Sequence, residues 1–453
     1  MLENLFKLKE NGTDVKTEVI AGFTTFMTMA YIIIVNPQIL SVAGMNQNGV
    51  FVATILGIIL GTVVMAFLTN YPFALASGMG LNAFFAFVIV DAMKVPWEIA
   101  LGLVFIEGIL FIVLSILPVR KMIVNSIPMG LKSSISAGIG LFIAFIGLQN
   151  AGIIVADQAT LVTLGNIKSG PAIIALFGLL LIGILYKMRV KGSIFIGILG
   201  SALLAWIGIE VGWFTDIALA PGGAPLTAFA DVAEGGFIGL PAWSDFNEVF
   251  LKLDILGALK LTFLPALLTF LIVDMFDTAG TLVGVSQQAG YLDEEGNLPK
   301  AGNALLADAI GTAGGALFGT STVTTYIESA SGVAEGGRTG LTGIVVSILF
   351  LLTLIFTPLF RLIPIAAAAP ALVVVGVMML TNITKIEWDD FSEALPAFLT
   401  IIMMPLTYSI SEGIAFGFIF YPLMKLLTGK GKKVHWLVYT IGVLFLVYFI
   451  WIK

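Results

Sequence analysis

A few acidic side chains lie within long apolar stretches of the sequence, where charge is costly. Asp274 and Asp277 stand three residues apart in the run LTFLIVDMFDTAGTLVGV, a spacing that places them near one face of a helix. Asp308 lies in ALLADAIGTAGG, Glu107 lies in VFIEGILF, and Glu328 closely follows the hydroxyl-rich run GTSTVTTY. Carboxyl groups at membrane depth are functional candidates. They can take up and release a proton, and they accept hydrogen bonds from a ligand.

A structural role in helix packing explains the presence of some of these acidic residues as well as a functional role does. Glu107 and Asp308 are typical of carboxyl groups that bond to a neighbouring helix, and Asp274 fits a packing role about as well as a functional one. Asp277 and Glu328 lie nearest to short polar runs, so they are the principal candidates for contact with a ligand.

The composition requires lipid as the surroundings of this chain. Of its 453 residues, 58% are apolar and only 11% are charged, against roughly 25% in average soluble domains. The mean hydropathy is +1.05. With about 20 residues in each spanning helix, we expect about fourteen transmembrane helices. The chain is then a multi-pass membrane protein in contact with lipid, and we expect no nucleic-acid partner.

Other residue counts narrow the chemistry. The chain has no cysteine, which excludes disulfides, thiol nucleophiles and thiolate metal sites. Its one histidine, His435, lies among lysines near the C-terminus, so a histidine relay and a multi-histidine metal site are excluded as well. We expect no cofactor or metal, no cleaved signal peptide and no ATP-binding loop. Proton chemistry then falls to the carboxyl groups.

The apolar stretches form two series separated by an acidic interval. We expect a first repeat over 1–209, an acidic external loop over 210–252, a second repeat over 253–428 and a further apolar segment over 429–453. Seven spans in each series give the two halves opposite orientations, as in inverted-repeat transporters. The segment at 434–452 fits either a fifteenth span or a helix along the interface. The expected spans lie at about 19–42, 49–69, 72–91, 97–117, 131–152, 171–187, 193–209, 255–285, 302–318, 320–337, 340–360, 365–384, 395–408 and 409–428.

The basic residues indicate the orientation. If every span crosses the membrane, the loops on one side contain all but one of the Lys and Arg residues considered, and Arg361 lies on the other side. The positive-inside rule makes the basic side cytoplasmic. We therefore expect a cytoplasmic-membrane protein with a cytoplasmic N-terminus. The bases on that side are Lys7, Lys9, Lys16, Arg120, Lys121, Lys132, Lys187, Arg189, Lys191, Lys425, Lys430, Lys432 and Lys433.

One segment in each half departs from a continuous helix. The run YPFALASGMG at 71–80 precedes a helical run that resumes at Leu81, and GTSTVTTY at 319–326 precedes IESASGVAEG. Both are typical of extended backbone that leads into a half-helix, although loops between spans are the alternative. Irregular backbone at membrane depth is tolerated inside the protein or along a cavity. Paired interruptions in two halves therefore indicate a transport site, at which half-helix N-termini meet an electron-rich ligand.

Several motifs resemble one transporter family. These are FDTAGTL at 276–282, ADAIGTAGGALFGTSTVTTYIESASGV at 307–333 and SGMGLNAFFAF at 77–87. They resemble the purine permeases of the nucleobase-cation symporter 2 group, in the azaguanine-uptake branch of the xanthine/uracil permease superfamily. AGFTTFMTMAYIIIVNP at 21–37 is also similar, so the resemblance covers nearly the whole chain.

The resemblance implies an all-α fold of two inverted seven-helix repeats. Short strands would open spans 3 and 10, and a core domain from spans 1–4 and 8–11 would move against a gate domain from spans 5–7 and 12–14, often in a homodimer. By family pattern, Asp277 and Glu328 would be the principal purine ligands. Asn82 would be a further contact, although a helix-capping role also fits it. The candidates are Asp277, Glu328, Asn82, Gly80 and Thr325 for substrate, Asp277, Glu328 and Asp274 for proton coupling, and Asp308 as a secondary or gate residue.

These residue types suit a purine. Guanine presents N1–H beside a 2-amino group, a pair that one carboxylate accepts in bidentate fashion, whereas the 6-amino group of adenine suits an amide such as Asn82. Phe26, Phe84 or Phe85 would stack on the ring or simply pack the interior. The sequence predicts a secondary transporter, not an enzyme, that imports purine nucleobases by proton symport, with guanine and hypoxanthine favoured over adenine.

Two other classes of protein remain as alternatives. A xanthine/uracil carrier or an anion carrier would share the fold, although the sister uracil and xanthine carriers bear a glutamate where this chain has Asp277. An anion carrier would favour a neutral or basic residue in place of Glu328. An intramembrane aspartate-dependent enzyme would use Asp274 and Asp277. A protease of that kind needs two aspartates from different helices and a prenyltransferase needs further Asp-rich loops, and neither pattern is complete in the sequence.

Overall fold

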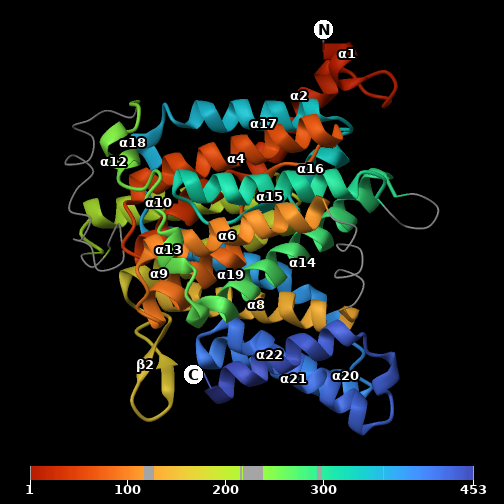
Figure 1. Ribbon diagram of the computed structural model, residues 1–453. Helices are drawn as coiled ribbons and strands as arrows, with labels where there is room; N and C mark the ends of the chain where they lie inside the picture. Colours follow the sequence, from red (N-terminus) through yellow and green to blue (C-terminus); the bar gives the residue numbers. More distant parts are fainter. Residues whose placement is uncertain are drawn as a thin grey trace.

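The computed structural model describes residues 2–116, 127–214, 217, 238–292, 298–360 and 362–451. Its long helices lie side by side along a common direction (Figure 1). Within the described ranges, nine helical runs are long and apolar enough to cross a membrane, and several shorter apolar helices accompany them. The nine runs are Val15–Val42, Gln47–Thr69, Trp97–Ile116, Met129–Asn150, Gly170–Lys187, Ser193–Glu210, Leu261–Ser286, Ile365–Lys385 and Ile410–Leu427.

The first half of the chain supplies ten of the described helices and three strands. They are α1 (Leu2–Phe6), α2 (Val15–Met29), α3 (Ile32–Val42), α4 (Gln47–Thr69), β1 (Leu75–Ser77), α5 (Met79–Ala83), the π-helix η1 (Phe84–Ala92), α6 (Trp97–Ile116), α8 (Met129–Asn150), β2 (Ile154–Asp157), β3 (Leu161–Leu164), α9 (Gly170–Lys187) and α10 (Ser193–Glu210).

The second half adds one strand and the remaining helices. They are α12 (Trp243–Asn247), α13 (Ile255–Ala258), η2 (Leu261–Phe263), α14 (Leu264–Ala289), α15 (Ala301–Phe318), β4 (Val323–Thr325), α16 (Ser329–Ala334), α17 (Gly340–Thr353), α18 (Thr357–Phe360), α19 (Ile365–Leu380), η3 (Thr381–Lys385), α20 (Phe391–Thr407), α21 (Ile410–Leu427), η4 (Gly431–Lys433) and α22 (Trp436–Trp451).

Local side chains fix several helix ends. The Asp14 side chain accepts a hydrogen bond from the N–H group of Thr17 and so caps α2, while Asn46 caps α4 by accepting from the N–H groups of Asn48 and Gly49. Such caps replace the partners that the first turn of a helix lacks. At the end of α15, Gly319 takes a positive φ of 98°, a conformation that glycine adopts without strain. The chain therefore leaves α15 sharply and enters β4.

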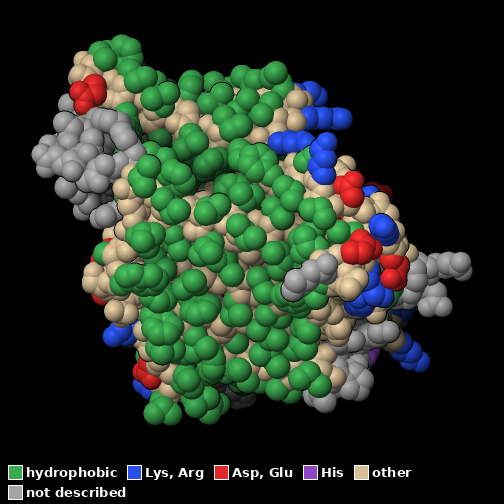
Figure 2. All heavy atoms as spheres, turned by 90° about the horizontal axis from the view of Figure 1, so that it is seen from above, with side chains coloured by type: hydrophobic (Ala, Val, Ile, Leu, Met, Phe, Trp, Pro, Cys, Tyr) green, Lys and Arg blue, Asp and Glu red, His purple; other side chains and the backbone are tan. Residues whose placement is uncertain are grey.

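The surface is that of a protein embedded in lipid. Figure 2 shows one face largely covered by hydrophobic side chains, with most of the visible Lys and Arg side chains gathered near one edge. Large apolar residues on the outer helices, such as Leu180 on α9 and Leu203 on α10, are more than half exposed. A large apolar surface of this kind is typical of a membrane-spanning protein.

The structure adds details that the sequence did not indicate. The expected span at 19–42 is divided at Ala30 and Tyr31 into α2 and α3. The half-helix of the first interrupted segment begins at Met79 instead of Leu81, and it continues as a π-helix over Phe84–Ala92. The β2–β3 hairpin projects from the end of the helix bundle that also carries α12 (Figure 1).

Only parts of the expected acidic loop over 210–252 lie within the described residues. In its last part, Asp245 and Glu248 accept hydrogen bonds of 2.7 Å from the side chains of Asn48 and Asn46, at the start of α4. Residues 215–216 and 218–237 lie outside the described residues, as do Arg120, Lys121 and Arg361.

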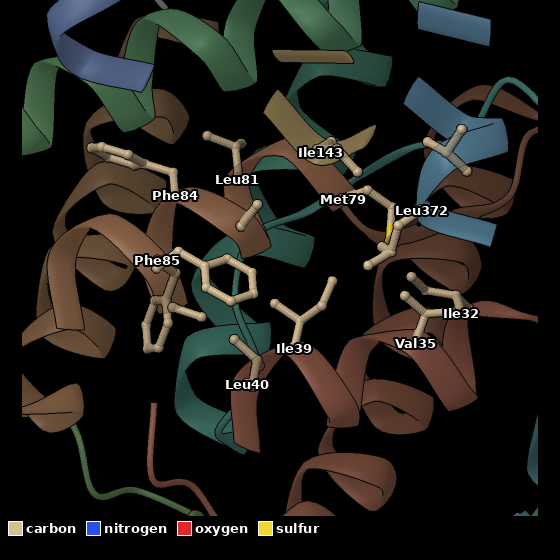
Figure 3. Packing of buried hydrophobic residues seen from close by; sticks show 14 of the residues in the cluster. Ile32, Val35, Ile39, Leu40, Met79, Leu81, Phe84, Phe85, Ile143 and Leu372 are labelled. Carbon is tan, nitrogen blue, oxygen red and sulfur yellow. The ribbon is translucent and has the colours of Figure 1, made fainter. Parts of the chain in front are cut away.

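The main apolar cluster joins the first interrupted segment to α3, α8 and α19. Figure 3 shows Ile39 and Leu40 of α3, Leu81 and Phe85 of the first interrupted segment, and Ile143 and Leu372 of α8 and α19 in one cluster. Because these side chains are buried, they hold the half-helix in the interior of the protein.

Candidate functional site

Two strands from opposite halves of the chain meet in the interior. β1 and β4 pair antiparallel, with Leu75 opposite Thr325 and Ser77 opposite Val323. All six strand residues are buried. The structure thus confirms the predicted strands and excludes the alternative that the two runs are surface loops.

The strand pair is extended by bonds at both ends. The N–H group of Gly78 donates to the carbonyl of Thr322 at 3.0 Å, and that of Tyr326 donates to the carbonyl of Ala74 at 2.9 Å. The Tyr326 hydroxyl also donates to the carbonyl of Ser77 at 2.7 Å. These bonds satisfy backbone that would otherwise be unpaired at membrane depth. They also fix where the two half-helices begin.

Asp277 and Glu328 lie next to this strand crossing. Asp277 is on α14, and Glu328 is the residue that precedes α16. Both are only partly buried, and the negative charge of Asp277 acts on Glu328. The hydroxyl group of Tyr31 donates a hydrogen bond of 2.8 Å to Glu328. No side chain or backbone donor among the described residues is bonded to Asp277, so its carboxylate is available to a ligand.

Asp308 connects α15 to the second strand. One oxygen accepts hydrogen bonds from the backbone N–H of Thr325 at 2.7 Å and from its hydroxyl at 3.0 Å, and the other accepts from the hydroxyl of Thr278 at 2.8 Å. Asp308 is fully buried. Both donors of Thr325 are therefore engaged by Asp308, which holds β4 in position.

Asn82 is held by a network around Asn36. The Nδ2 group of Asn36 lies 2.7 Å from Oγ1 of Thr54, 2.9 Å from Oγ1 of Thr320 and 3.2 Å from Oγ of Ser77. Its Oδ1 accepts a hydrogen bond of 2.6 Å from Nδ2 of Asn82. The Oδ1 atom of Asn82 is buried and has no donor among the described residues, so it is an unoccupied acceptor.

Gly80 allows the first half-helix to approach α8 closely. A Cβ atom at this position would lie 2.6 Å from Cγ2 of Ile139 on α8. Contacts below 3.0 Å require a shift, so only glycine fits here without one. The structure thus gives a steric reason for the glycine, next to Asn82 and the strand crossing.

Asp274 lies one helical turn from Asp277 and is fully buried. Its Oδ2 atom lies 3.1 Å from the hydroxyl of Thr312, which also contacts the backbone N and O atoms of Val323 on β4. Asp274 is therefore linked to the strand crossing through α15.

The aromatic candidates lie in packed positions. Phe84 and Phe85 are fully buried in the main apolar cluster (Figure 3). Phe84 also contacts the edge of Phe270, with 4.9 Å between ring centroids, and Phe26 meets Phe350 at the same distance. These rings fill the interior in the edge-to-face geometry that aromatic pairs prefer.

Sequence reasoning missed two residues of the site, Tyr31 and Asn36. Both lie in the apolar run AYIIIVNP, in which a tyrosine and an asparagine are the polar exceptions. A polar side chain within such a run needs a partner, and that need is the signal that could have singled them out.

The sequence is similar to known permeases over nearly its whole length. Residues 16–416 match the model of the xanthine/uracil permease family, described as "Permease family". The guanine/hypoxanthine permease PbuG of Bacillus subtilis is 45% identical, covering 100% of both chains. The adenine permease AdeP of Escherichia coli is 42% identical, covering 100% of this chain and 96% of its own length.

A solved structure supports the fold. The transmembrane domain of the cyanobacterial bicarbonate transporter BicA superposes with a TM-score of 0.64 at 16% identity, covering 89% of this chain and 97% of that domain. Its likeness shows a common architecture, the two inverted seven-helix repeats that the sequence predicts. With matches over nearly its whole length, the chain belongs to the xanthine/uracil permease family, whose members are membrane transporters and not enzymes.

Proposed function

We propose that this permease imports purine nucleobases by proton symport across the cytoplasmic membrane. The observation that carries the proposal is the set of acceptors at the strand crossing. Asp277 accepts no hydrogen bond from any described residue, and its negative charge acts on Glu328. The Oδ1 atom of Asn82 is buried and also accepts no hydrogen bond from a described residue. The names of the relatives, which include guanine/hypoxanthine and adenine permeases, point to the same substrate class.

A purine supplies the donors that these acceptors lack. In guanine, N1–H and the 2-amino group can donate together to one carboxylate. Its imidazole N–H can then reach a second acceptor, as can that of hypoxanthine. Asn36 engages one of the two N–H donors of the Asn82 amide, while its Oδ1 atom remains an unoccupied acceptor. This arrangement favours oxopurines, which present more ring N–H groups than adenine does.

The same acceptors disfavour an anionic substrate. Asp277 and Glu328 are close enough for their charges to interact, and a third negative charge between them would be repelled. The anion-carrier alternative therefore has no support at this site, although the fold is shared with a bicarbonate transporter.

Alternating access would follow from movement of the core domain against the gate domain. We assign the strands, α5, α14 and α15 to the core, and α8 to the gate. The close approach of Gly80 to Ile139 is then a contact across the moving boundary. Proton binding by Asp277 or Glu328, with Asp274 behind them, would neutralise the site before the core moves. Release of purine and proton would occur on the side of the basic loops, where we place the N-terminus.

Uptake measurements test this proposal. Cells that lack their own purine carriers and express this chain are expected to accumulate radiolabelled hypoxanthine. Excess guanine should compete strongly, adenine less, and xanthine and uracil least. Collapse of the proton gradient at constant sodium should remove the accumulation. Uptake that continued unchanged after this collapse would refute proton symport, and competition by uracil alone would refute the purine assignment.

A further inference from the structure

A second group of acids lies behind the proposed substrate site. Glu107 on α6, Asp274 on α14 and Asp308 on α15 are all fully buried. Glu107 lies against Asp274, and the charges of Asp274 and Asp308 act on each other. The negative charge of Asp277 also acts on Asp274 and on Asp308, so this further neighbour is acidic as well. None of these acids forms an ion pair with a basic side chain among the described residues.

Hydrogen bonds satisfy Asp308 but not the other two acids. Asp308 accepts bonds from Thr278 and Thr325. In contrast, both oxygens of Glu107 and the Oδ1 atom of Asp274 are buried and receive no hydrogen bond from any described residue. Buried polar groups are nearly always bonded. Three orphaned oxygens on two adjoining carboxyl groups therefore require a binding partner that is not a protein side chain.

The remaining oxygen of Asp274 competes with the backbone of β4 for its hydrogen-bond donor. Its Oδ2 atom lies 3.1 Å from the hydroxyl of Thr312. That hydroxyl accepts from the N–H group of Val323 and lies equally close to the Val323 carbonyl. Because a hydroxyl has one hydrogen, it can donate either to Asp274 or to the strand, but not fully to both.

A single shared proton satisfies two of these three oxygens. Two ionised carboxylates in contact, buried and without donors, repel each other and lose their hydration. One proton between them converts the repulsion into a short, charge-assisted O–H···O hydrogen bond. A metal ion is disfavoured, because within the described ranges no three acidic, histidine or cysteine side chains are arranged as metal ligands.

We propose that Glu107 and Asp274 form a proton-binding site and that this pair, in place of Asp277 or Glu328, holds the proton coupled to purine transport. This inference rests on the proposed proton symport and adds Glu107, which lies outside the substrate site, as a coupling residue. Asp274 is one helical turn from Asp277, and Thr312 connects it to β4. A purine that binds against Asp277 and the strands thus acts on the carboxyl group that shares the proton.

The test uses the full chain, purified and reconstituted in liposomes, with Glu107→Gln as the main variant. Glutamine keeps the shape and supplies a permanent donor to Asp274, as the protonated glutamate would. The matched control is Glu98→Gln on the same helix, at a partly exposed position. Glu107→Asp retains an ionisable group and should preserve coupling.

Three readouts separate coupling from structure. Glu107→Gln should bind radiolabelled hypoxanthine and exchange it across the membrane as wild type does. It should not concentrate hypoxanthine when a pH gradient is applied, whereas wild type and Glu98→Gln should concentrate it by about tenfold per pH unit if one proton moves with each purine. In infrared difference spectra, the C=O band of a protonated carboxyl group should disappear in Glu107→Gln only.

Each other outcome has a distinct meaning. If wild type does not respond to the pH gradient, proton symport itself is wrong. If wild type responds and Glu107→Gln responds equally, symport stands and the role of Glu107 is refuted. Loss of hypoxanthine binding and exchange in Glu107→Gln would assign Glu107 a structural role, and accumulation driven by a sodium gradient would replace the proton with a metal ion. Either result would overturn the inference.

Discussion

The hydroxyl group of Tyr31 donates a hydrogen bond of 2.8 Å to Oε1 of Glu328, across 297 positions of sequence. Tyr31 lies at the turn between α2 and α3, and Glu328 lies directly before α16. The bond therefore joins the two halves of the chain at the proposed substrate site. It fixes the direction in which the carboxyl group of Glu328 points.

Removal of this bond should weaken purine binding. A hydrogen bond to a charged group contributes about 1.5–3 kcal/mol, and each 1.4 kcal/mol corresponds to about tenfold in affinity. Tyr31→Phe keeps the ring and removes only the donor, so we expect KM for hypoxanthine uptake to rise by at least about tenfold. An unchanged KM would show that Tyr31 does not position Glu328 for the substrate.

A side chain at position 80 should impede transport by steric overlap. Gly80→Ala would place a Cβ atom 2.6 Å from Cγ2 of Ile139, and overpacking of this kind costs roughly 1–3 kcal/mol. We expect slower hypoxanthine uptake at an unchanged level of protein in the membrane. Gly183→Ala is the matched control, because a Cβ atom there meets no atom within 4 Å.

A second substitution should distinguish this overlap from other effects. Ile139→Ala removes the obstructing Cγ2 atom and should restore uptake in the Gly80→Ala background. Ile139→Val retains a methyl group at that place and should not restore it. Equal rescue by both, or by neither, would contradict a direct contact between Gly80 and Ile139.

The amide network should contribute to stability as well as to binding. Asn36→Ala removes one bond each from the hydroxyl groups of Thr54 and Thr320 and leaves the amide nitrogen of Asn82 without its partner. An orphaned buried polar group costs about 1–3 kcal/mol, so the purified variant should unfold at a lower temperature and bind hypoxanthine more weakly. Asn303→Ala, which removes an exposed bond to the Leu68 carbonyl, is the control and should leave both quantities unchanged. Normal hypoxanthine binding by Asn36→Ala would show that Asn36 does not orient Asn82.

Local patterns predicted the strands and the half-helices well. Proline and glycines in YPFALASGMG and β-branched residues in GTSTVTTY indicate extended backbone without knowledge of the fold. The π-helix after Ala83 was not foreseen, because no residue in FFAFVIVDA marks it. The turn at Tyr31 was missed for the same reason.

Contacts between the two halves were beyond a local reading. Asn36 meets Thr320 across 284 positions, and Tyr31 meets Glu328 across 297. The partner of Glu107 was likewise not predictable, because its sequence context favoured a hydrogen bond to another helix. Glu107 does lie against α14, but its neighbour there is Asp274, and it accepts no hydrogen bond from any described residue. Burial alone could not indicate which partner a carboxyl group has.

We place the substrate site on Asp277 and Glu328. The most direct test is radiolabelled hypoxanthine uptake by Asp277→Ala and Glu328→Ala in cells without their own purine carriers, with the amount of each variant in the membrane measured in parallel. We expect each variant to reach the membrane and uptake to be abolished in both. Normal uptake by either one would contradict this assignment.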